Sequence, residues 1–147
     1  VNYAEHRADI LLYGGITAVN ITANRFEAFF ADYALWSLNL GGIYYNNAIN
    51  FEKNFLTGRK CNDKAILFEN TQYSTISENE FYSFYLPNNQ VTETQTNLFN
   101  AVVQTVTNSS NISTSGNHVD NSAWGYTKNE DATYSWKSLV SDCSWRH

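Results

Sequence analysis

Aromatic residues are as common as charged residues in this chain, and that balance limits what it can fold into. Ten Tyr, nine Phe and four Trp make up 16% of the sequence, and Asp, Glu, Lys and Arg make up another 16%. Disordered chains show the opposite balance, since they carry many charges and few aromatic residues. A chain of 147 residues can bury roughly two-thirds of its unfolded surface around one core. We therefore expect a single compact domain over residues 1–147.

The charge and the uncharged stretches exclude two classes of partner. The net charge is −5 at pH 7, whereas a nucleic-acid-binding protein needs a basic face. The longest stretches without charge are Tyr33–Phe51 and Thr94–Val119, and polar Asn, Ser, Thr or Gln residues interrupt both. A membrane-spanning helix needs about 20 predominantly apolar residues. We therefore expect neither a nucleic-acid partner nor a transmembrane segment.

Three segments show the spacing of apolar residues that is typical of helices. The first, Asn24–Ser37, opens with a capping-box pattern, and the second, Ile43–Leu56, follows the pair Gly41-Gly42. The third begins at a second capping box, formed by Thr92 and Gln95. The aromatic residues of the first segment fall at helical intervals: Phe26, Phe29, Phe30, Tyr33 and Trp36.

The rest of the chain has a period closer to two, which predicts strands. Strands are expected at Ala65–Phe68, Tyr73–Ile76 and Glu80–Leu86, and a hairpin pairs Ser122–Lys128 with Ala132–Val140. Thr107–Asn117 is rich in Ser, Thr and Asn and is expected to form an exposed loop. Near the start, Ala8–Tyr13 and Ile16–Ile21 flank Gly14-Gly15; a hairpin and a short helix both fit, and we favour extended structure.

No repeat of fixed period is evident, which argues against solenoids and propellers. The pattern as a whole predicts an α+β fold, with about three helices packed on an antiparallel sheet of four or more strands.

The cysteines and the start of the chain favour an extracellular protein. Cys61 and Cys143 lack the spacing of a metal site, and a bond between them would tie down a tail that otherwise frays. The chain begins at Val1 and contains no Met. We therefore expect a Cys61–Cys143 disulfide in a secreted chain processed from a precursor. Three sequons permit glycosylation, although about three are expected by chance in so Asn-rich a sequence: Asn20, Asn108 and Asn111.

No catalytic, metal or cofactor motif stands out. His118 and Asp120 would share one face of a strand, as would Glu78 and Glu80, but two ligands do not make a metal site and an edge strand commonly carries such carboxylates. Cys61 lies among basic residues, yet no nucleophile signature surrounds it. We therefore expect no metal and no cofactor, and the balance is against an enzyme.

The last part of the sequence holds the strongest candidate for a binding surface. Trp124, Tyr126, Tyr134 and Trp136 lie on the two strands of the expected hairpin, and the polar residues among them are Ser122, Thr127, Thr133 and Ser135. Exposed rings of this kind stack on sugars or fill partner pockets, whereas buried ones form core. Both alternatives are open from the sequence.

These observations favour a secreted, non-enzymatic interaction protein of the toxin or effector type, with a cell-surface protein or glycan as partner. A glycan-binding, lectin-like module that uses the aromatic hairpin is the first alternative. A small secreted hydrolase is the second.

Overall fold

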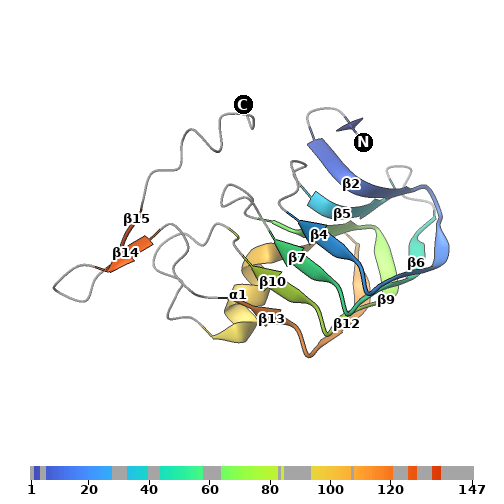
Figure 1. The fold of residues 1–147 in the computed structure, drawn as a ribbon. Helices are drawn as coiled ribbons and strands as arrows, with labels where there is room; N and C mark the ends of the chain where they lie inside the picture. Colours follow the sequence, from blue (N-terminus) through green and yellow to red (C-terminus); the bar gives the residue numbers. More distant parts are fainter. Residues whose placement is uncertain are drawn as a thin grey trace.

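The computed structural model describes residues 2–3, 6–27, 33–39, 44–57, 64–82, 84, 94–106, 108–120, 126–128 and 134–136. Three short strands recur four times along the chain (Figure 1). The first strands are β2 (His6–Tyr13), β5 (Tyr33–Leu38), β8 (Ile66–Glu69) and β11 (Val103–Val106). The second strands are β3 (Thr17–Thr22), β6 (Asn46–Glu52), β9 (Thr71–Ser77) and β12 (Ser110–Ser115). The third strands are β4 (Arg25–Glu27), β7 (Phe55–Thr57), β10 (Glu80–Tyr82) and β13 (His118–Val119).

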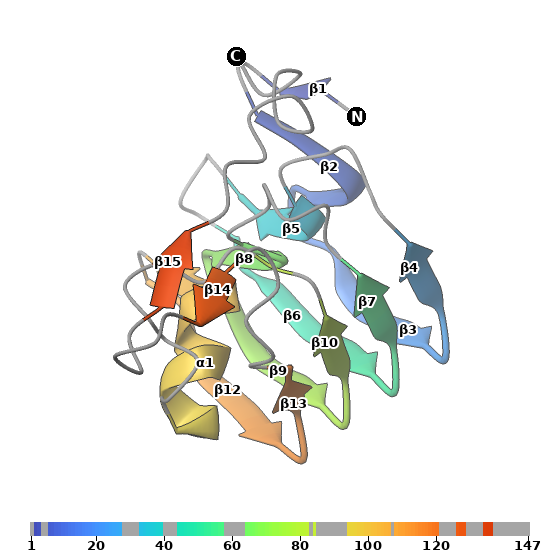
Figure 2. The same cartoon turned by 60° about the vertical axis from the view of Figure 1, so that its left-hand side comes forward.

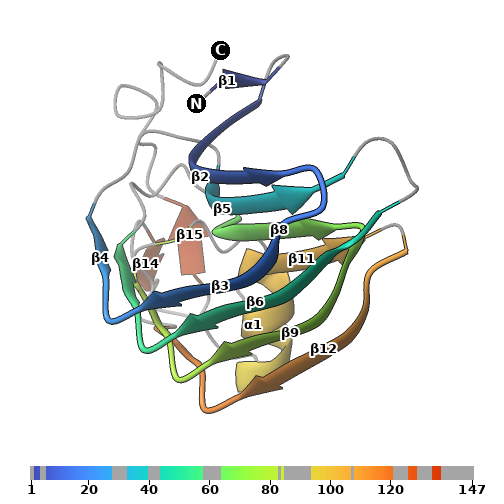
Figure 3. The same ribbon diagram turned by 90° about the vertical axis from the view of Figure 1, so that its right-hand side faces the viewer.

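Each set of three strands forms one coil, and the four coils stack so that equivalent strands pair in parallel. The first strands form one sheet in the order β2-β5-β8-β11, the second strands a second sheet and the third strands a third sheet. Figure 3 shows the second sheet in front of the first, and Figure 2 shows the third sheet beside the second. A short strand, β1 (Asn2–Tyr3), pairs antiparallel with β2 at one edge. The architecture is a parallel β-solenoid of four coils.

The expected α+β fold is therefore wrong. The described residues contain one helix, α1 (Gln95–Val102), and the three main sheets are parallel apart from β1. The helix expected over Asn24–Ser37 is replaced by strands β4 and β5, and the one expected over Ile43–Leu56 by β6 and β7. The helical spacing of the aromatic residues is a coincidence. The segment that contains them spans two strands, β4 and β5, which belong to consecutive coils.

Excluding a solenoid was also wrong, and the register shows why no period was visible. The pairs Arg25↔Phe55, Phe55↔Glu80 and Glu80↔His118 are 30, 25 and 38 residues apart. Each coil contains the same three strands, but the connections between the strands differ in length from coil to coil. In addition, each second strand contains one residue in the left-handed conformation, which interrupts its two-residue alternation: Ala18, Ala48, Tyr73 and Asn111.

The core fills the space between the three sheets. Inward side chains stack from coil to coil, as in the row that the register sets through Ile10, Leu35, Ile66 and Val103. Of these, the last three are almost completely buried. A separate apolar cluster includes Trp36 and Leu67, which neighbour core residues in sequence and so lie on the other face of the first sheet.

An asparagine ladder holds the turn between the second and third sheets. Each turn has two residues: one with φ between 54° and 68°, then an Asn, at positions 24, 54, 79 and 117. The backbone N–H of each Asn donates to Oδ1 of the Asn in the next coil, at 2.8, 2.9 and 3.0 Å. The Nδ2 of that next Asn donates back to a carbonyl of the previous coil, at 2.9, 3.0 and 2.9 Å. The ladder satisfies buried backbone groups that a tight turn would otherwise leave unpaired.

Helix α1 closes the end of the stack beside coil 4. The Gln95 side chain accepts from the Val119 N–H at 2.8 Å and donates to the Val119 carbonyl at 3.0 Å, so it takes the place of a further strand beside β13. Leu98 and Val102 are fully buried in the core below it. A helix was expected in this segment and is confirmed for Gln95–Val102, although its cap is Thr94 and not Thr92. The apolar stripe that predicted this helix continued to Val106, but Val103–Val106 form strand β11.

Several smaller expectations can be compared with the structure. Gly14 and Gly15 form a turn with positive φ between two extended segments, but β2 and β3 lie in different sheets and do not form a hairpin. Residues 110–115 of the expected loop form strand β12. Strands β14 (Tyr126–Lys128) and β15 (Tyr134–Trp136) pair antiparallel, as the expected hairpin requires.

No disulfide is present among the described residues, and Cys61 and Cys143 both lie outside them.

Candidate functional site

The outer face of the second sheet carries three rows of polar side chains, one residue from each coil in every row. The register defines the rows as Thr17–Asn47–Gln72–Ser110, Asn20–Asn50–Thr75–Ser113 and Thr22–Glu52–Ser77–Ser115. All twelve are half-buried or exposed, and Glu52 alone among them is charged. We call this surface the polar face. Protein surfaces usually carry many more charges, so its neutrality is unusual.

Most hydroxyl groups of the polar face have no hydrogen-bond partner among the described residues. Asn50 Nδ2 donates to Asn20 Oδ1 at 3.0 Å, and Asn47 Nδ2 donates to the Tyr45 carbonyl at 3.0 Å. Within the described part of the chain, no hydrogen bond involves the side chains of Thr75 or Ser113. Because strands of one sheet lie about 4.8 Å apart, these groups form a regular array that faces solvent.

Three tyrosines lie at the beginning of this face. Tyr13, Tyr44 and Tyr73 are 48%, 70% and 64% exposed, and they are the exposed large hydrophobic residues of the described chain. Tyr73 belongs to β9 itself, and its left-handed backbone carries the side chain outward. Tyr13 ends β2, and Tyr44 precedes β6 and lies next to Gly15. The exposed large apolar side chains of the described residues are thus gathered where the second strands begin.

The outer face of the third sheet is built differently, from side chains that contact one another. The Arg25 guanidinium lies 4.5 Å from the centroid of the Phe55 ring. Phe55 stacks on Tyr82 with centroids 5.1 Å apart, and the Tyr82 ring is 6.0 Å from that of His118. The row runs across all four coils, and each of its rings contacts the next member of the row, although the His118 side chain is about half exposed.

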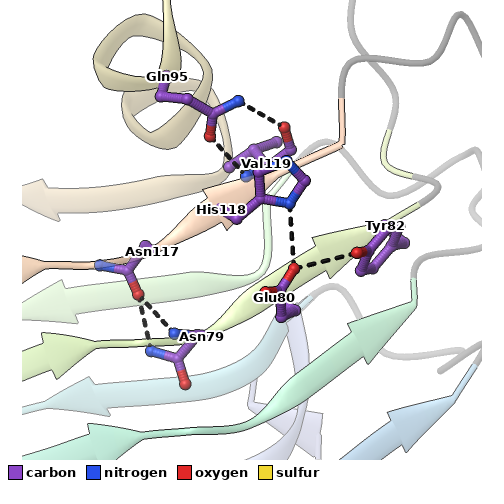
Figure 4. A network of polar contacts seen from close by, with 7 residues as sticks. All are labelled: Asn79, Glu80, Tyr82, Gln95, Asn117, His118 and Val119. Carbon is purple, nitrogen blue, oxygen red and sulfur yellow. Dashed lines mark hydrogen bonds and ion pairs between the residues drawn. The ribbon is translucent and has the colours of Figure 1, made fainter.

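A carboxylate joins the last two members of that row (Figure 4). Glu80 Oε2 accepts from the Tyr82 hydroxyl at 3.0 Å and lies 3.0 Å from His118 Nδ1. The hydrogen bond to Glu80 raises the pKa of Tyr82 above its ordinary value, because the phenol can donate it only while protonated. Tyr82 is therefore a hydrogen-bond donor and not a base. The side chains of Glu80 and His118 are about half exposed.

The structure pairs the candidate residues differently from the sequence expectation. The side-chain partner of His118 is Glu80, from the neighbouring coil, and not Asp120. Glu78 and Glu80 do not share a strand face, because Glu78 occupies the turn before β10 and lies 3.9 Å from Lys53 Nζ. The expectation that these two carboxylates share one strand face is therefore wrong.

The aromatic hairpin remains a prediction as a binding surface. Tyr126 pairs with Trp136 and Lys128 with Tyr134 in the backbone register. The side chains of Tyr126, Tyr134 and Trp136 lie outside the described residues, as does Trp124.

Sequence reasoning missed the polar face and the Glu80–His118 contact, because both depend on stacking. One sequence signal could have revealed the stacking of the coils. The four segments that contain the ladder share an Asn that is followed two residues later by an apolar residue, as in Asn24-Arg25-Phe26 and Asn117-His118-Val119. Aligning the chain on that Asn would have placed Glu80 beside His118.

The described part of the chain contains no cluster of three or more His, Cys, Asp or Glu able to hold a metal ion. None of its helices is long and apolar enough to cross a membrane. Comparison with known protein families, with curated proteins and with solved structures finds no match.

Proposed function

We propose that this protein is a non-enzymatic binding protein that recognises a neutral glycan outside the cell, and that it binds through the polar face. The observation that carries the proposal is the array of twelve in-register side chains, eleven of them uncharged. The proposal keeps glycan recognition, the first alternative from the sequence, but places it on the solenoid.

The chemistry of the face matches that of a sugar polymer. Hydroxyl and amide groups both donate and accept hydrogen bonds, as sugar hydroxyls do. A neutral ligand gains nothing from charged partners, whose desolvation would weaken binding. The exposed Tyr73 supplies a ring with an apolar face and a polar end, which is the combination that stacks on a sugar ring.

The outer face of the third sheet is a weaker candidate for a binding surface, and also a weak candidate for a catalytic site. Its rings stack on each other, so their faces are occupied. Glu80 accepts hydrogen bonds from Tyr82 and His118 on an open surface. Water there screens the electrostatic interactions through which a catalytic carboxylate acts. A hydrolase proposal would rest on this contact alone.

The test is retention on insoluble neutral polysaccharides together with affinity electrophoresis in soluble ones. We expect binding that changes little between low and high salt, because no ion pair contributes to it. Tyr73→Ala is expected to weaken binding about tenfold, the loss of one aromatic contact of roughly 1–1.5 kcal/mol. Thr75→Glu, which places a charge in the central row, is expected to weaken it further.

Tyr82→Ala is the matched control, since it removes a tyrosine from the other face. It should leave retention on the polysaccharide unchanged. Equal loss of binding in Tyr73→Ala and Tyr82→Ala, or binding that salt abolishes, would contradict the proposal. No retention on any neutral polysaccharide would also end it.

A further inference from the structure

A pocket lies between helix α1 and the last turn of the solenoid, away from the exposed tyrosines. Its volume is about 190 Å³, and its lining is neutral. The lining residues are Gln95, Thr96, Phe99, Asn100, Thr114, Ser115, Gly116 and Asn117. The volume is below the ~300–1,000 Å³ of pockets for drug-sized ligands, so it suits one small group.

The asparagine ladder ends in this pocket. In coils 1 to 3, the backbone N–H of the ladder Asn and the carbonyl three residues before it both bond the side-chain carboxamide of the ladder Asn in the next coil. For example, the Asn24 N–H and the Ile21 carbonyl both bond the carboxamide of Asn54. In coil 4 the equivalent groups are the Asn117 N–H and the Thr114 carbonyl. Neither has a partner in the direction away from coil 3 among the described residues, and both residues line the pocket.

A row of inward-facing residues on the second strands also ends at this pocket. Ile21, Phe51 and Ile76 occupy this row in the first three coils and are buried. The fourth member is Thr114, which is polar and exposed. The sequence therefore changes from apolar to polar where the pocket begins.

We infer that this pocket binds a primary carboxamide, the group carried by asparagine and glutamine side chains. The chain itself provides four bound examples: three ladder asparagines, and Gln95, whose carboxamide bonds both the N–H and the carbonyl of Val119 at this same end. The Asn117 N–H would donate to the ligand oxygen, and the Thr114 carbonyl would accept from the ligand nitrogen.

The geometry selects among amides. In each ladder step the oxygen and the N–H of one carboxamide contact the same neighbouring coil. A primary amide can point both groups the same way, whereas a trans secondary amide points them in opposite directions. A carboxylate has no proton to donate to the Thr114 carbonyl.

The test is an NMR titration of the whole protein with propionamide, observing the backbone amide of Asn117. We expect a saturable shift in the millimolar range, as a ligand of so few atoms allows. Propionate and N-methylpropionamide should produce at least about tenfold weaker binding, because each loses one of the two hydrogen bonds. L-asparagine and a peptide with one internal asparagine then distinguish a free ligand from a side chain.

Thr114→Phe and Thr114→Val form the matched pair of variants. Phenylalanine fits this row at Phe51 and fills the pocket, so it should abolish the shift. Valine keeps the size of threonine, so binding should change less than about threefold. Should Thr114→Phe fail to fold, Thr96→Trp on the exposed side of α1 blocks the same pocket.

The inference is overturned if propionamide produces no saturable shift at Asn117, or if N-methylpropionamide binds equally well. It is also overturned if a folded Thr114→Phe still binds. None of these results affects binding of polysaccharide to the polar face, which is tested separately.

Discussion

The second and third sheets are built by the same four coils, yet their outer faces differ in what their side chains contact. On the third sheet, Arg25, Phe55 and Tyr82 form one connected row, and Glu80 bonds both Tyr82 and His118. On the polar face, the side-chain hydrogen bonds within the described part of the chain come from the amides of Asn47 and Asn50, and the hydroxyl groups face solvent. A side chain that already has a partner must lose it before binding a ligand, whereas a solvated hydroxyl exchanges only water. The comparison therefore indicates that side-chain contacts on the third sheet add stability, and it supports the proposal that a ligand binds to the second sheet.

The largest expected effect is at the turn that joins the two faces. Asn54 is 1% exposed, and its side chain bonds the Asn24 N–H and the Ile21 carbonyl. Asn54→Ala leaves both groups unpaired, so we expect it to lower the free energy of unfolding by about 2–4 kcal/mol. Asn50→Ala, in the same coil but on the polar face, should change it by less than about 0.5 kcal/mol. Urea unfolding followed by circular dichroism measures both.

An equal loss in the two variants would contradict the division between the ladder and the polar face. A small loss in Asn54→Ala would mean that water or the neighbouring Asn79 replaces its hydrogen bonds.

The same turn shows how far the sequence could be interpreted. Asn24 followed by Glu27 matches a capping box, and local pattern alone cannot separate a helix cap from a ladder position, since both place a side-chain oxygen near a backbone N–H. The difference lies in the partner: Asn24 donates its N–H to Asn54, 30 residues away. By contrast, helix α1 and the pairing of β14 with β15 were predicted, because short-range contacts determine them. Elements stabilised by stacking between coils were not.

The second expected effect compares the two faces directly. Phe55→Ala removes the ring that lies between Arg25 and Tyr82, and we expect a loss of about 1–2 kcal/mol in unfolding free energy. Thr75→Ala, on β9 and facing outward from the second sheet, should cost less than about 0.5 kcal/mol. Thermal melts of both variants, together with polysaccharide retention, separate the roles. The comparison fails if Phe55→Ala abolishes binding without loss of stability.

The candidate sites were less predictable than the local elements. The sequence offered His118 only a partner from its own segment, Asp120, because the sequence shows only near neighbours. Glu80 reaches it from 38 residues away through strand pairing. The polar face could not be found either, since Asn20, Asn50 and Thr75 become one row only once the uneven coil lengths are known.

The smallest expected effect concerns Tyr82, where the row on the third sheet ends in a hydrogen bond. The pKa of Tyr82 is raised because its hydroxyl donates to Glu80 and because the nearby negative charges of Glu80 and Asp120 oppose the phenolate. A pKa that is higher in the folded than in the unfolded state stabilises the fold at pH values below the ordinary tyrosine pKa. That contribution is lost as the pH rises through the raised pKa. Glu80→Gln should therefore lower the pKa of Tyr82 toward its ordinary value, which ring-carbon NMR shifts of labelled tyrosine measure against pH. Glu78→Gln is the matched control, because Glu78 lies in the turn and does not bond Tyr82. If both variants shift Tyr82 equally, the effect comes from net charge, and the contact between Tyr82 and Glu80 contributes nothing specific to the row.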